Sequence, residues 1–127
     1  METQLRTRLL NDATVSAIVG IKVHWGVRPQ GEAYPSLVLT IVNDPRPQDY
    51  QGNINHRATR VQADCYGLTR AQAVALREAV IAAIVPTATV GGVTFRRAFI
   101  NNVLNRDEYT DTGLVFRDMV DFEIWHG

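Results

Sequence analysis

Three histidines and a single cysteine are the side chains of this 127-residue chain best suited to catalysis or metal binding. His24, His56 and His126 lie far apart in the sequence, and no pair of them has the spacing of a metal-binding motif. Cys65 is the only cysteine, so it cannot form a disulfide within the chain and belongs to no CxxC motif. We interpret Cys65 as a small core residue on the apolar face of a strand.

Acidic residues near the C-terminal end are the second candidate for chemistry. The carboxylates of Asp118, Asp121 and Glu123 are the ligand type that divalent cations prefer. Strand alternation, however, places Asp121 and Glu123 on the outward face of a sheet, where arginines of neighbouring strands can pair with them. We therefore expect no catalytic residue, no cofactor and no metal site.

The alternative is a small α+β hydrolase or ligand-binding domain. A protein of that class gathers its reactive side chains in one concave site. The candidates for such a site in this chain are His24, His56, Asp64 and Asp118.

Basic and aromatic residues alternate at one place in the chain, which is how single-strand nucleic-acid platforms are built. Arg96 and Arg97 lie between Phe95 and Phe99, and Arg57 and Arg60 are the other basic candidates. The two aromatic rings are expected on a buried face, and the whole chain has 13 basic and 13 acidic residues. A net charge of zero supplies no general attraction for nucleic acid or for an acidic membrane. We expect no specific DNA binding.

Length and composition predict one globular domain that spans residues 1–127. Hydrophobic residues make up 46% of the chain and charged residues 20%, which is typical of a soluble protein with its own core. No apolar run approaches the ~20 residues that cross a bilayer. No signal peptide is visible at the N-terminus.

The segment from Arg57 to Val85 is the clearest structural signal. Apolar residues alternate with polar ones from Arg57 to Tyr66, which predicts a strand with one buried face. Gly67 ends this strand. Thr69 and Gln72 then have the spacing of a capping box, in which a hydroxyl and an amide satisfy two N–H groups at a helix start. The following helix is expected to extend to Val85.

The remaining elements complete an α+β fold in the order α-α-β-β-β-α-β-β. We expect a mostly antiparallel or mixed sheet of four to five strands with the helices packed on one face. Val93–Leu104 is predicted as one long strand with a bulge, because its apolar residues do not alternate cleanly. Asp118 falls on the inward face of the last strand and interrupts its pattern. Residues 43–57 contain Pro45 and Pro47 and predict a long flexible loop.

The ordered series of these segments closely resembles one family, the small tail-completion or tail-terminator proteins of long-tailed phages and gene-transfer-agent-like particles. The residues that carry the resemblance are Leu9 and Leu10, then Asp12, Val15, Ile18, Val19 and Gly20, the strand Tyr34 to Thr40, the strand Arg60 to Tyr66, the helix start Thr69 to Ala73, and the final strand Asp121 to His126.

The resemblance implies a structural protein that caps the tail tube and forms the joint to the head–tail connector. Its partners would be other copies of itself in a ring, expected to be a hexamer, together with the tail-tube protein and the connector or stopper protein. DNA would only pass through the ring, and no membrane is involved. The protein would be made in the cytoplasm of a bacterial host and would end in the virion. A head–tail stopper or adaptor is the alternative within the same class.

Two groups of residues are predicted to make the contacts of such an assembly. In the loop, side chains of the types that anchor interfaces are expected to bind a partner ring and to order on doing so. These are Arg46, Asp49, Tyr50, Ile54 and Arg57. On the helix, the width of the apolar stripe by itself favours deep burial in the same chain, but the resemblance implies that its second flank meets a neighbouring subunit. The predicted subunit interface consists of the apolar Val74, Ile81 and Val85 together with Arg77.

Overall fold

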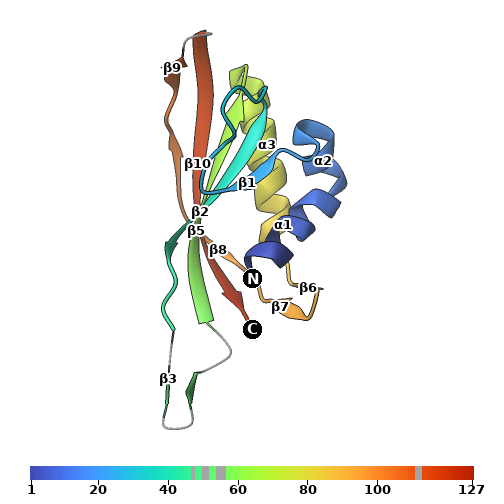
Figure 1. Cartoon of the computed structure of the whole chain (residues 1–127), viewed down its shortest axis with the longest axis vertical. Helices are drawn as coiled ribbons and strands as arrows, with labels where there is room; N and C mark the ends of the chain where they lie inside the picture. The colour runs from blue at the N-terminus through green and yellow to red at the C-terminus, as the bar shows by residue number, and fades with distance from the viewer. Residues whose placement is uncertain (47, 50–51, 54–56, 111–112) are drawn as a thin grey trace.

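Three helices cover one face of a mixed sheet in the computed structural model, which describes residues 1–46, 48–49, 52–53, 57–110 and 113–127 (Figure 1). The helices are α1 (Glu2–Asn11), α2 (Ala13–Val19) and α3 (Arg70–Ile84). This arrangement confirms the predicted α+β class. The sheet has eight strands rather than four to five, because short segments that the pattern did not mark as strands also pair.

The long strand β10 (Gly113–His126) organises the sheet. It pairs antiparallel with β5 (Arg57–Gly67) from Phe116↔Gly67 to His126↔Arg57. The main sheet order is β1-β2-β5-β10-β7-β6, with β8 and β9 also paired to β10. Among the strand pairs of this sheet that the structure describes, only β1 and β2 run parallel. The remaining strands of this sheet are β1 (Val23–Trp25), β2 (Ser36–Asn43), β6 (Ala88–Val90), β7 (Val93–Phe95), β8 (Phe99–Asn105) and β9 (Glu108–Thr110).

Side-chain caps define where two of the helices begin. Asp12 accepts hydrogen bonds from the backbone N–H groups of Thr14 and Val15, both at 3.0 Å, and so starts α2. At the start of α3, the Thr69 hydroxyl accepts from the N–H of Gln72 at 3.1 Å, and the Gln72 side chain accepts from the N–H of Leu68 at 2.8 Å. The predicted capping pair therefore satisfies two N–H groups, as expected.

The hydrophobic core lies between the helices and the sheet. Leu5 and Leu9 of α1 and Leu76 of α3 are fully buried, as are Phe95 and Phe122 on the sheet. Cys65 lies in the same cluster with no exposed surface, and burial raises the pKa of its thiol. A thiol that is buried and protonated is unreactive, in agreement with its interpretation as a core residue.

The predicted single strand Val93–Leu104 is two strands, so that prediction was wrong. The chain leaves β7 at Arg96, whose N–H donates to the Trp125 carbonyl at 2.8 Å, and then passes beneath the end of α3. There the N–H of Ala98 donates to the Val85 carbonyl at 3.0 Å. The expected irregularity also exists, as a register shift between β8 and β10 at Asp121/Phe122. Contacts with the end of α3 therefore interrupt the segment that the sequence pattern predicts as one strand.

Candidate assembly interface

A small hairpin projects beyond the sheet where the sequence predicted an irregular loop (Figure 1). Its two strands are β3 (Gln48–Asp49) and β4 (Gly52–Asn53), with Gln48 opposite Asn53 and Asp49 opposite Gly52. Of the predicted partner-binding residues, Asp49 thus lies in β3. Tyr50 and Ile54 lie outside the described residues.

Asp44 holds the base of this hairpin to the sheet. Its carboxylate accepts hydrogen bonds from Arg57 at 2.9 Å, from the Thr59 hydroxyl at 2.8 Å and from Arg46 at 3.0 Å. Burial opposes the charge of Asp44, but these hydrogen bonds outweigh it and lower the pKa of the carboxyl group. The segment predicted as a flexible loop is therefore held at its base by polar contacts within its own domain. Arg46 and Arg57 both bind this carboxylate.

His126 continues the same network into the buried interior. Its Nε2 lies 2.7 Å from the Thr59 hydroxyl, and its ring packs beside Phe95 with the two centroids 6.3 Å apart. The residue is 3% exposed. Burial, and secondarily the positive charge of Arg57, lowers the pKa of His126 to about 4. The imidazole is therefore neutral at neutral pH and serves as a hydrogen-bonding core group.

The shifted pKa of His126 predicts a loss of stability in mild acid. In the unfolded chain His126 binds a proton below its ordinary pKa of about 6.5, whereas in the folded chain it binds one only near pH 4. The free energy of unfolding therefore falls as the pH falls from about 6.5 to about 4. We expect a loss of about 2 kcal/mol between about pH 7 and about pH 5. Urea unfolding at the two pH values measures it. His126→Gln is the control and should lose far less; an equal loss in both proteins would assign the effect to other groups.

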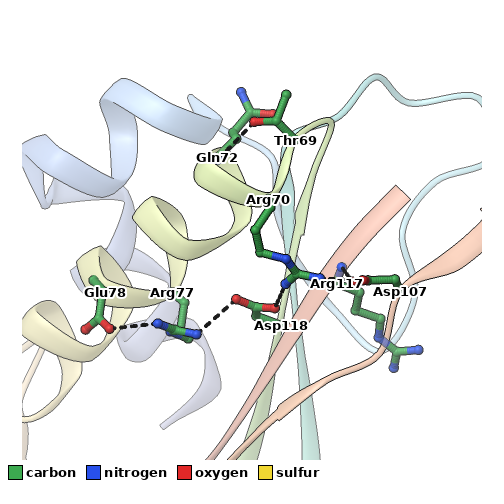
Figure 2. A network of polar contacts seen from close by, with 8 residues as sticks. All are labelled: Thr69, Arg70, Gln72, Arg77, Glu78, Asp107, Arg117 and Asp118. Carbon is green, nitrogen blue, oxygen red and sulfur yellow. Dashed lines mark hydrogen bonds and ion pairs between the residues drawn. The ribbon is translucent and has the colours of Figure 1, made fainter. Parts of the chain in front are cut away.

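A second polar network joins α3 to the sheet around Asp118 (Figure 2). Asp118 has no exposed surface and lies between the side chains of Arg70 and Arg77, with the Arg77 contact at 3.2 Å. Arg70 also binds Asp107, which in turn accepts from the backbone N–H of Arg117 at 3.3 Å. The inward-facing Asp118, which interrupts the apolar pattern of the last strand, is thus the acceptor for two arginines of the covering helix.

The candidate hydrolytic residues bind separate partners. His24 lies 2.7 Å from Glu32, and Asp64 lies 3.2 Å from Arg117 on the sheet face opposite Asp118. His56 lies outside the described residues. In the part of the chain that the structure describes, no three histidine, cysteine or acidic side chains gather as metal ligands. None of its helices is long and apolar enough to span a membrane.

The predicted interface flank of α3 makes contacts within its own chain. Ile81 and Val85 are partly buried and pack against the core cluster, and Val74 is half-buried. Arg77 binds Asp118 and Glu78. The role of this flank between subunits stays a prediction.

A group of four exposed large apolar side chains lies instead on β8, which sequence reasoning did not identify. All seven of its residues are exposed. The predicted burial of Phe99 is wrong, because Phe99 is 53% exposed and lies opposite Glu123 on the face away from the helices, whereas Phe95 is buried. The other large apolar side chains of the strand are exposed by 38% to 42%. These are Ile100, Val103 and Leu104. The sequence signal for this exposure was that the apolar residues of Val93–Leu104 do not alternate cleanly with polar ones.

Comparisons with known proteins agree with this architecture. The family described as "Tail completion protein gp17" matches residues 3–127. A chain from the solved structure "Virion of native gene transfer agent (GTA) particle" has the same fold, with a TM-score of 0.74 and 18% identity. The superposition covers 100% of this chain and 95% of that one. No curated protein matches the sequence. Because the family match extends over nearly the whole chain, the protein belongs to the tail completion protein gp17 family and is a structural protein of the virion.

Proposed function

We propose that the protein caps the end of the tail tube and forms the joint to the head–tail connector, acting as a ring that is hexameric. The tube-end surface stops further addition of tube subunits, and the opposite surface binds the connector. DNA passes through the ring without specific contacts. The family match over residues 3–127 supports an assembly role, and the resemblance described above supplies the ring.

The observation that carries this proposal is the hairpin of β3 and β4, which extends past the sheet (Figure 1). Asp44, which precedes the hairpin in the chain, binds Arg57 and Thr59, which follow it. A projecting hairpin with a fixed base can reach a neighbouring ring without unfolding any part of the domain. Arg46 has a side chain that is 61% exposed, so it remains accessible to a partner although it binds Asp44. The residues assigned to partner binding are Arg46, Asp49, Tyr50, Ile54 and Arg57.

Shortening Pro45–Asn53 to a tight turn tests the proposal. We expect the melting temperature to change by only a few degrees, because the segment adds no side chain to the described core. Tail completion should be lost. In a host that supplies only this variant, electron microscopy should show filled heads and separate tails.

The hairpin variant needs its own control for assembly competence. Its self-association, measured by sedimentation, should equal that of the wild-type chain, so that the defect lies in partner contact alone. Normal infectious particles from the shortened chain would show that the hairpin is a spacer and would overturn the proposed contact.

A further inference from the structure

A second hairpin lies at the end of the molecule opposite the hairpin of β3 and β4. It consists of β9 and the start of β10, in which Gly113 pairs with Thr110 and Leu114 with Tyr109. Figure 1 shows the longest axis of the molecule vertical, with β9 at its top and β3 at its bottom. The molecule therefore carries a hairpin at each end of its long axis.

The base of this second hairpin is bound to the rest of the domain. Asp107, immediately before β9, is bound by Arg70 of α3 and accepts from the backbone N–H of Arg117 at 3.3 Å (Figure 2). The N–H of Arg106 donates to the Arg117 carbonyl at 2.7 Å. Asp44, before β3, is bound by an arginine in the corresponding way. Each hairpin thus begins at an aspartate that an arginine from outside the hairpin binds.

Large apolar side chains are exposed at the β9 end. Tyr109 is 86% exposed, and Leu114, directly opposite it, is 39% exposed. Leu68, which is 57% exposed, follows Gly67, and Gly67 pairs with Phe116 two positions from Leu114. Exposed aromatic and aliphatic side chains that are grouped in this way are typical of a surface that contacts another protein.

The charges at this end do not select a charged partner. Asp107 and Arg70 bind each other. Arg106 and Glu108 are exposed, carry opposite charges and form no ion pair within the described residues, and Asp111 lies outside those residues. A phosphate backbone would require an excess of basic side chains, which is not found here. The surface that fits this end is therefore an apolar one, with a hollow for an aromatic ring.

The exposed apolar side chains of β8 belong to a different surface. β8 pairs with the middle of β10, from Asp118 to Glu123, and with no other described strand. This isolated strand lies along the side of the molecule, between its two ends. The end marked by β9 is the one that lies opposite the hairpin of β3 and β4.

A protein that joins two partners along one line needs a binding surface on each of two opposite sides. The proposed function assigns the hairpin of β3 and β4 to one partner. In a ring whose β3–β4 hairpins point toward one neighbour, the opposite ends of the same subunits point toward the other neighbour. The β9 end is therefore placed to make the second contact.

We infer that Tyr109, Leu114 and Leu68 bind an apolar surface of the virion protein on the side of the ring that the β3–β4 hairpin does not reach. The inference rests on the proposed function and assigns its second contact surface. The tail tube and the connector lie on opposite sides of the ring, so Tyr109 contacts whichever of them the hairpin does not.

Serine replacements test this contact in the full-length chain. In a host that supplies only the variant with Tyr109→Ser and Leu114→Ser, complete particles counted by electron microscopy should fall at least about tenfold. Both side chains are exposed, so the melting temperature should change by only a few degrees. Tyr109→Ser alone, at the more exposed position, should give the same defect if the double variant folds poorly. Val27→Ser removes a side chain that is 79% exposed after β1, and this matched control should leave the number of complete particles unchanged.

The location of the variant proteins distinguishes the two sides of the ring. Separate heads and tails are purified by sedimentation, and an antibody detects this protein on each. The variant at Tyr109 and Leu114 and the variant with the shortened hairpin each lose contact with a different partner. Only one of these two variants should therefore remain bound to the tails.

Three outcomes would overturn the inference. The first is a normal number of complete particles from the variant at Tyr109 and Leu114. The second is that both variants remain on the tails, or that neither does, because the two hairpins would then not bind different partners. The third is a loss of self-association in sedimentation velocity that Val27→Ser does not share, which would place Tyr109 between subunits of the ring. In each case, loss of tail completion on hairpin shortening would still support the proposed function, so the two ideas fail separately.

Discussion

Replacing Arg70 and Arg77 together by methionine is expected to lower the free energy of unfolding by about 3–5 kcal/mol. Both guanidinium groups bind the carboxylate of Asp118, which has no exposed surface. Methionine keeps the apolar stems that pack on the sheet but leaves a buried negative charge without a partner. Urea denaturation, monitored by circular dichroism, measures the loss.

Two further variants separate charge burial from general damage to the helix. Arg46→Met breaks an ion pair whose arginine is 61% exposed, and it should cost less than about 1 kcal/mol. Adding Asp118→Leu to the double variant removes the unpaired charge and should recover a large part of the stability. A double variant within about 1 kcal/mol of the wild type would show that water already solvates Asp118.

The second large effect is expected at Gly67, where the end of β5 meets the start of α3. A β-carbon at this position would lie 2.7 Å from the backbone nitrogen of Ala73 and 3.1 Å from its α-carbon. Both are main-chain atoms, which move only if the helix moves. We therefore expect Gly67→Ala to destabilise the fold by about 2–3 kcal/mol through overpacking.

Thermal unfolding measures this effect as a melting temperature lower by about 10 °C. Leu68→Ala is the neighbouring control. Leu68 is 57% exposed, so its truncation should change the melting temperature by only a few degrees. A Gly67→Ala protein as stable as the wild type would mean that α3 can shift away from β5 without loss, and that the Arg70 and Arg77 contacts with Asp118 tolerate the shift.

The sequence by itself determined the features that depend on neighbours along the chain. The capping pair at Thr69 and Gln72 and the buried face of Val61, Ala63 and Cys65 follow from spacings of two to four residues. Such spacings report local geometry directly. The ordered series of these segments also indicated the family, which the match over residues 3–127 confirmed.

Only the tertiary structure decided which side chains meet across long separations. In the sequence, Asp118 interrupts the apolar pattern of the last strand. Its partners Arg77 and Arg70 on α3 lie 41 and 48 residues away along the chain. The sequence indicates only that Gly67 ends a strand. In the structure, the backbone of Ala73 lies so close to Gly67 that it leaves no room for a side chain. Phe99 is exposed because its pairing with Glu123 places it on the sheet face away from the helices, and the isolation of β8 likewise depends on which strands pair. Periodicity along a chain carries no information on strand pairing, because pairing is a property of segments brought together by folding.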